Sequence, residues 1–128
     1  MTLRANLSPE APWIQISTTE DDWDGADPSL LTAMLSQLVL IRTFEEAALE
    51  LAAEGNIHGP AHSSIGQEGG AVGSVLPLTS ADTANGSHRG HHQFIAKVLA
   101  HVAPHGIDPR EDFSADIRDV LLTTMDVS

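Results

Sequence analysis

Residues 27–55 read DPSLLTAMLSQLVLIRTFEEAALELAAEG, the clearest helical pattern in this sequence. Asp27 suits the N-cap position, Pro28 suits the first helical position, and Gly55 suits a helix end. Apolar residues recur between them at helical spacing, at Leu31, Met34, Leu35, Leu38, Ile41, Ala48 and Leu51. We therefore predict a helix over residues 28–54, about 40 Å long.

Two faces of this helix differ. Residues 38–41 (LVLI) are apolar around most of one turn, which predicts burial on both sides, against a subunit or within a larger domain. Glu46, Glu50 and Glu54 follow at i,i+4 spacing, where like charges repel mildly, so this face is predicted to be solvated.

Composition places the chain among ordinary globular proteins. It has 128 residues and 41% hydrophobic residues, enough for one domain or a piece of a larger one. The formal net charge of -12 argues against nucleic-acid binding. The sequence shows no membrane span, no signal peptide and no cysteine, so a cytoplasmic protein is expected.

The regions on either side of the long helix carry weaker signals. Residues 1–26 have no sustained period and are predicted to form an extended arm, with Trp13 and Trp23 as anchors on a partner or on the body. Residues 84–87 are predicted to be extended. A final amphipathic helix is predicted over residues 116–125.

Two further helices are predicted between these regions. One runs from Gln67 to about Leu76, capped by Ser63 or Ser64, with Glu68 in its first turn. Its glycines imply close approach of a ligand or another backbone; they are Gly66, Gly69, Gly70 and Gly73. The other runs over residues 93–102, with one face formed by Phe94, Val98 and Val102.

Residues 55–107 differ in charge from the rest of the chain. They hold only two acids, Glu68 and Asp82, together with all seven histidines. The segment 87–92 (SHRGHH) stands just before a predicted helix, where free backbone N–H groups attract anions. Arg89 adds a planar set of donors suited to phosphate oxygens. These features predict a phosphate-binding turn.

Other chemistries have less support. His58 and His62 have the spacing of a zinc pair, but Gly59 and Pro60 lie between them, so a zinc site is only a minor alternative. The sequence lacks a nucleophile elbow, a P-loop and a GxGxxG motif, which argues against acyl-enzyme catalysis and nucleotide hydrolysis.

Three blocks of the sequence, in order and in spacing, resemble one enzyme family. They are residues 34–46 (MLSQLVLIRTFEE), 55–73 (GNIHGPAHSSIGQEGGAVG) and 87–97 (SHRGHHQFIAK). The family is the alpha subunit of the decarboxylating component of thiamine diphosphate-dependent 2-oxo acid dehydrogenase complexes, such as the pyruvate, branched-chain and acetoin dehydrogenases. The resemblance implies an α/β fold, a doubly wound parallel sheet of which this chain is the mainly helical N-terminal part. Residues 27–128 would then belong to the cofactor-binding domain, with residues 103–116 as an insertion.

The resemblance also implies a function and roles for particular residues. The cofactor's C2 ylid attacks a 2-oxo acid, carbon dioxide leaves, and the acyl group passes to a lipoyl-bearing acyltransferase. Arg89 would hold the diphosphate, assisted by His88. His62, facing the thiazolium and substrate, and His91, near the mouth of the site, would both be catalytic residues. Gln67 would belong to the cofactor-binding residues. Together with Glu68, it would stabilise the loop and helix behind His62.

The chain lacks part of the family's site. Its magnesium motif, Gly-Asp-Gly followed by Asn, is absent and is expected beyond residue 128, so no metal ligand is assigned here. The glutamate that activates the cofactor belongs to the beta subunit or to a fused beta half. We therefore expect the N-terminal segment of such an oxidoreductase, in an oligomer. The alternatives are a non-catalytic interaction or oligomerisation module derived from the family, and a histidine metal binder.

Overall fold

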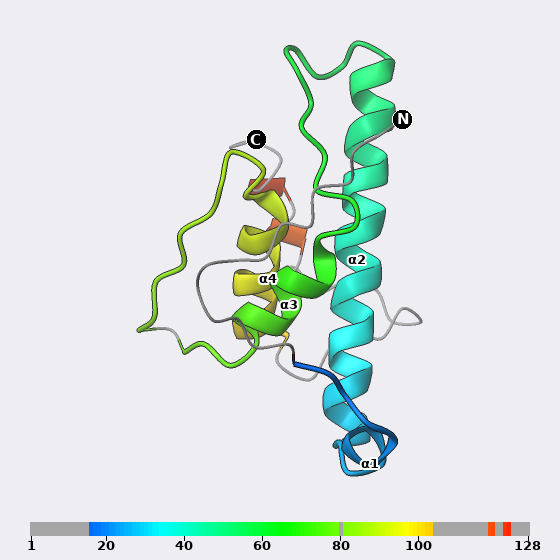
Figure 1. The fold of residues 1–128 in the computed structure, drawn as a ribbon. Helices are drawn as coiled ribbons and strands as arrows, with labels where there is room; N and C mark the ends of the chain where they lie inside the picture. The colour runs from blue at the N-terminus through cyan, green and yellow to red at the C-terminus, as the bar shows by residue number, and fades with distance from the viewer. Residues whose placement is uncertain (1–15, 80, 104–117, 120–121, 124–128) are drawn as a thin grey trace, which may run out of the picture.

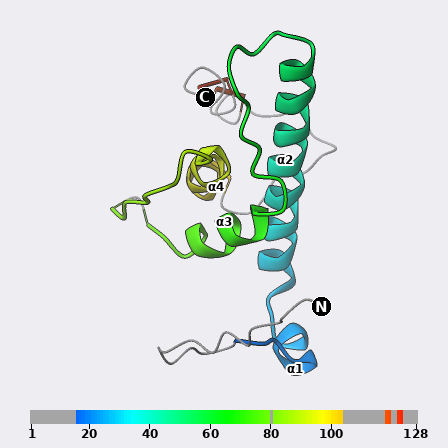
Figure 2. The same ribbon diagram turned by 45° about the horizontal axis from the view of Figure 1, so that its top comes forward.

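The computed structural model of the chain describes residues 16–79, 81–103, 118–119 and 122–123 (Figure 1). Its elements, in order, are α1 (Glu20–Asp24), α2 (Pro28–Ala53), α3 (Glu68–Val75) and α4 (His91–Val102). α2 is the long upright helix, and α3 and α4 pack against one side of it and against each other (Figures 1 and 2). No strand occurs within the described ranges, and residues 84–87 form a loop. None of the helices in these ranges is long and apolar enough to cross a membrane.

The predicted long helix is confirmed to within one residue at its end. The Asp27 side chain accepts a hydrogen bond from the Ser29 amide at 2.9 Å, and Pro28 occupies the first turn. Gly55 follows the helix with a φ of 81°, a conformation that glycine adopts without strain. The glutamates predicted to be solvated, Glu46, Glu50 and Glu54, are exposed. The buried stripe repeats every fourth residue and consists of Ala33, Gln37, Ile41 and Glu45.

The core forms where α2, α3 and α4 meet. Ile41 from α2, Val72 from α3, and Ile95 and Leu99 from α4 are all fully buried. Each such side chain contributes about 1.5–3 kcal/mol by leaving water. This contact holds α3 and the start of α4 beside the middle of α2, which places the loops before both helices next to each other.

α4 differs from its prediction in its start and in its buried face. It begins at His91, two residues earlier than predicted. The residues that it buries are His92, Ile95, Ala96 and Leu99. Phe94, which the prediction placed on the apolar face, is 41% exposed. The prediction chose the wrong face because His92 is buried although it is polar.

α3 is also shorter than predicted, and its cap is different. Gln67 is the N-cap residue and makes no side-chain cap hydrogen bond, so neither serine caps this helix. Glu68 does lie in its first turn. Apart from adjacent residues and the helix's own backbone, no described atom lies within 4 Å of a Cβ built on Gly69, Gly70 or Gly73, so no other described backbone approaches these glycines. Close approach of a ligand stays a prediction.

Part of the predicted extended arm is helical. Thr19 and Asp22 form a capping box around α1, in which the Thr19 amide donates to Asp22 at 2.8 Å. α1 buries no residue, and Trp23 is 57% exposed, so it does not anchor this segment to the described body. Residues 1–15, with Trp13, lie outside the described residues, as do residues 104–117 and most of the predicted final helix.

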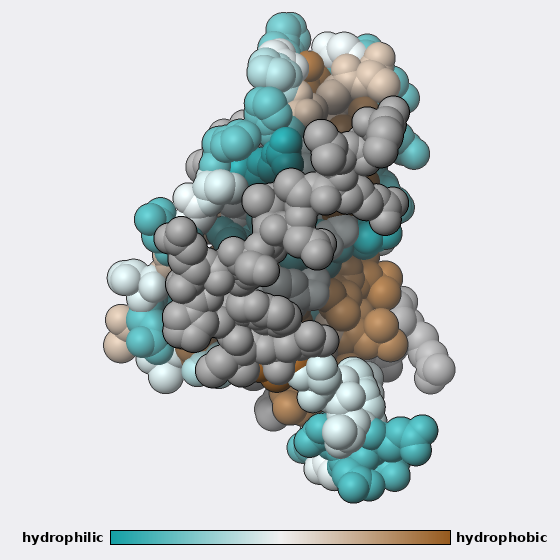
Figure 3. Space-filling model, viewed as in Figure 1, coloured by the Kyte–Doolittle hydropathy of each residue, from teal (hydrophilic) through white to brown (hydrophobic). Residues whose placement is uncertain are grey.

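The N-terminal half of α2 has a second, uncovered apolar side. Leu35 and Val39 are 61% and 58% exposed, and Leu30 is 45% exposed. Figure 3 shows hydrophobic surface over this part of α2. Within the described residues, one side of the helix faces α3 and α4 and the other is exposed, so its burial against a subunit or within a larger domain stays a prediction.

Candidate functional site

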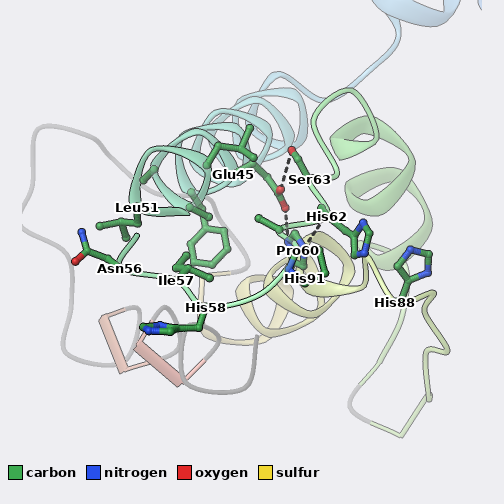
Figure 4. A pocket seen from close by; sticks show the side chains of 15 residues that line it. Glu45, Leu51, Asn56, Ile57, His58, Pro60, His62, Ser63, His88 and His91 are labelled. Atoms are coloured by element: carbon green, nitrogen blue, oxygen red, sulfur yellow. Dashed lines mark hydrogen bonds and ion pairs between the residues drawn. The ribbon is translucent and has the colours of Figure 1, made fainter. Parts of the chain in front are cut away.

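A cavity of about 490 Å³ lies between the C-terminal half of α2, the loop after it and the start of α4 (Figure 4). Phe44, Ala48 and Leu51 give it an apolar side on α2. The other side carries four imidazoles, those of His58, His62, His88 and His91. Apolar walls that face a few polar groups are typical of sites for flat, partly polar ligands.

A buried carboxylate holds the loop beside this cavity. Glu45 is 1% exposed. Its Oε2 accepts hydrogen bonds from the Ser64 amide at 2.9 Å and from the Ser63 hydroxyl at 3.2 Å, and its Oε1 accepts one from the Ser64 hydroxyl at 2.5 Å. An ionised carboxylate costs several kcal/mol to bury unless donors replace its lost water. These donors therefore join α2 to the loop that carries His62.

His91 connects the same carboxylate to the backbone of His62. Its Nδ1 contacts Glu45 Oε1, and its Nε2 lies 3.1 Å from the carbonyl oxygen of His62. A carbonyl can only accept a hydrogen bond, so Nε2 is the donor in this contact. His91, predicted to lie near the mouth of the site, thus lines the cavity and holds its wall together.

His62 and His88 meet across the cavity mouth. Their ring centroids are 4.9 Å apart and the planes are nearly perpendicular, at 87°. Both residues are exposed, so ligands and protons can reach the rings. The structure brings these two predicted site residues together although they are far apart in the sequence. Each imidazole offers ring nitrogens that can donate or accept a hydrogen bond, which suits both rings for binding a polar ligand.

The predicted phosphate-binding turn does lie at the start of a helix. Gly90 is the N-cap residue of α4, and the Arg89 amide donates to the Ser87 hydroxyl at 3.2 Å. A Cβ on Gly90 would lie 2.9 Å from the Ser87 carbonyl oxygen, so the tight turn requires glycine there. The Arg89 side chain is exposed and is not part of the cavity wall. Anion binding by this turn stays a prediction.

An ion pair between Glu68 and Arg42 holds the end of the same loop that leads into α3. Arg42 Nε donates to Glu68 Oε1 at 2.6 Å, and the Gly66 amide donates to Glu68 Oε2 at 2.9 Å. The Arg42 guanidinium lowers the pKa of Glu68 to about 2. Gln67 is exposed and does not line the cavity. Its backbone amide donates to the Ser64 carbonyl at 2.9 Å. In the structure, Glu68 thus ties the loop behind His62 to α2.

Sequence reasoning missed Glu45 and Arg42 as parts of this site. A signal for Glu45 was present, because it continues the i,i+4 series of Gln37 and Ile41 on the buried stripe of α2. A carboxylate in a buried stripe needs hydrogen-bond donors close to it. No comparable signal identified Arg42, which lies 26 residues from its partner in the sequence.

The alternative chemistries gain no support. No group of three histidine or carboxylate side chains that could hold a metal occurs in the part of the chain that the structure describes. Both serines after His62 donate to Glu45, as described above.

Comparison with known proteins gives one partial similarity. No family model matches the chain, and no solved structure is significantly similar to it. The chain is 39% identical over 64 residues to the alpha subunit of acetoin:2,6-dichlorophenolindophenol oxidoreductase from Bacillus subtilis (strain 168). The match covers 50% of this chain but only 19% of that subunit. Along half of its length, this chain is therefore similar to one segment of an oxidoreductase alpha subunit.

Proposed function

We propose that the chain is the N-terminal part of an alpha subunit of a thiamine diphosphate-dependent 2-oxo acid dehydrogenase, and that it supplies the half of the site that holds the diphosphate. The observation that carries the proposal is the convergence of three predicted site residues, His62, His88 and His91, on one cavity next to the Arg89 turn. The similarity to an oxidoreductase alpha subunit supports it.

The proposal extends to the fold and the partners. The three packed helices α2, α3 and α4 would be the mainly helical start of a doubly wound α/β fold. A beta subunit or fused beta half would complete the site, and a lipoyl-bearing acyltransferase would receive the acyl group. The exposed apolar side of α2, at Leu35 and Val39, is consistent with further protein covering it.

The described residues fit the organic part of this cofactor. The apolar α2 side of the cavity suits flat heterocyclic rings, and the imidazoles opposite supply polar contacts. The exposed Arg89 side chain and the N-terminus of α4 suit a diphosphate. The described residues do not fit magnesium, because no set of ligands converges there. The family's magnesium motif, Gly-Asp-Gly followed by Asn, does not occur in these 128 residues.

Under this proposal each residue has a distinct task. Thiamine diphosphate, when bound, supplies the nucleophilic carbon needed to decarboxylate a 2-oxo acid. Arg89 and His88 bind the diphosphate. His62, exposed at the cavity, gives or takes a proton near the substrate. Glu68, through Arg42 and Gly66, keeps the loop of His62 in place.

Calorimetric titration of the chain with thiamine diphosphate tests the proposal. Arg89→Ala should weaken binding roughly tenfold or more, because a charged hydrogen bond to phosphate is worth about 1.5–3 kcal/mol. Lys97→Ala is the matched control, since Lys97 Nζ donates to the Thr79 carbonyl away from the cavity. Equal affinity of the unaltered chain for thiamine and thiamine diphosphate would contradict a diphosphate half-site.

A second candidate function is a non-catalytic oligomerisation module. The exposed apolar side chains of α2 favour it, because large uncovered apolar surface marks interaction sites. Sedimentation velocity of the chain should then show a defined oligomer that Val39→Gln dissociates. A monomer would argue against this function.

A further inference from the structure

Glu45 makes the most deeply buried side-chain hydrogen bonds of the described residues, although it also lines the cavity. Glu45 is almost fully buried, accepts hydrogen bonds from Ser63 and Ser64, and contacts Nδ1 of His91. Ser64 is itself fully buried. By contrast, the neighbouring acids Glu46 and Glu50 on α2 are exposed. One carboxylate of this acidic helix has therefore been taken out of water to hold a loop.

His91 has a different kind of partner at each ring nitrogen. Its Nδ1 faces the Glu45 carboxylate, and its Nε2 reaches the backbone carbonyl of His62. A residue that transfers protons to a ligand needs an accessible ring nitrogen. In His91, Nε2 is taken by the His62 carbonyl and Nδ1 is buried against Glu45. Among the described residues, no hydrogen bond or ion pair is made by the His62 ring. The ring of His62 instead faces that of His88.

We infer that Glu45 and His91 form a positioning pair, which holds the His62 backbone so that the His62 ring stands at the cavity mouth against His88. Glu45 accepts hydrogen bonds from the two residues immediately after His62, which are Ser63 and Ser64. His91 is hydrogen-bonded to the backbone carbonyl of His62 itself. With the backbone held at these points, the direction in which the His62 side chain leaves it is set.

The pair also links two helices to the loop. Glu45 belongs to α2 and His91 is the first residue of α4. The Phe44 ring lies 6.3 Å from the His91 ring and packs beside it. The arrangement makes His91 a positioning residue in place of the catalytic role that the resemblance implied. This inference rests on the proposed function only where it assigns His62 a role near the substrate.

Nitrogen-15 NMR of the unaltered chain is the first test. The Nε2 position of His91 should carry a slowly exchanging proton, because it donates to a carbonyl. A deprotonated Nε2 cannot make this bond and would overturn the inference. This measurement needs no substitution, so it does not depend on a variant folding.

Two substitutions test the pair as a unit. Glu45→Gln and His91→Gln should each abolish the nuclear Overhauser contact between the His62 and His88 rings and speed exchange of the Ser64 amide roughly tenfold or more. The double variant should show no larger effect than the more severe single variant, because both remove one unit. Additive effects, or an intact contact between the two rings in folded single variants, would refute the positioning role.

Matched controls and separate readouts complete the design. Glu50→Gln on α2 and His101→Gln on α4 change exposed residues of the same types, and both should leave the ring contact unchanged. All of these measurements are made without thiamine diphosphate. Failure of the cofactor titration would therefore overturn the proposed function and leave the positioning pair standing, whereas failure here would remove the pair alone.

Discussion

Replacing Glu68 by Gln should destabilise the chain at neutral pH and lose this effect in acid. Glu68 is 5% exposed, accepts from Arg42 Nε at 2.6 Å and from the Gly66 amide at 2.9 Å. The Arg42 guanidinium lowers its pKa from 4.5 to about 2. Since the pKa is lower in the folded state, the unfolded chain takes up the proton first as pH falls. The contribution is fully present above pH 4.5 and disappears towards pH 2.

The expected magnitude follows from the same contacts. A lowering from 4.5 to about 2 corresponds by linkage to about 3 kcal/mol. The Arg42 side chain is 44% exposed, so water screens this ion pair and the full value will not be realised. Glutamine keeps an acceptor oxygen for the Gly66 amide, so that bond can survive. We therefore expect Glu68→Gln to lower the free energy of unfolding by about 1–2 kcal/mol near neutral pH.

Urea unfolding followed by circular dichroism, from about pH 7 to about pH 2.5, measures this difference. Glu50→Gln is the matched control, because it removes the same charge from an exposed position. The comparison cancels the general relief of repulsion as this acidic chain is protonated. A difference between wild type and Glu68→Gln that stays constant with pH, or grows as pH falls, would refute the assigned ion pair.

Three further substitutions test the local structure. Gly90→Ala places a Cβ 2.9 Å from the Ser87 carbonyl oxygen and should cost about 1–3 kcal/mol in thermal unfolding; an unchanged melting temperature would mean that the turn is looser than described. Asp27→Ala removes the cap bond to the Ser29 amide and should cost about 1 kcal/mol in urea unfolding, and no loss would show that α2 does not depend on its cap. Ile95→Ala empties a fully buried core position and should cost about 2–5 kcal/mol by calorimetry, whereas a cost below 1 kcal/mol would place Ile95 outside the core.

Local signals in the sequence predicted the elements that local physics controls. Asp27, Pro28 and Gly55 marked the ends of α2, because capping and glycine conformations depend only on adjacent residues. The same kind of signal placed the Arg89 turn just before α4. The α/β fold class and the domain limits were not tested by these residues and stay predictions.

Predictions that depended on which side of an element is covered were less successful. Phe94 was placed on the apolar face of α4, but the helix buries the face of His92 instead. The α3 glycines were expected to face another backbone or a ligand; no other described backbone approaches them, and approach of a ligand stays a prediction. A helix period shows which residues share a face, but not which of two mixed faces meets its neighbours.

The sequence by itself thus determined the position and length of the long helix, the acidic character of the chain and the histidine-rich stretch after Gly55. Only the tertiary structure decided that Glu45, and not Glu46 or Glu50, is the buried acid, and that it meets His91. The reason is physical. Spacing along a helix is set by bonds between near neighbours, whereas these side chains meet because the packing of α3 and α4 on α2 brings distant loops together.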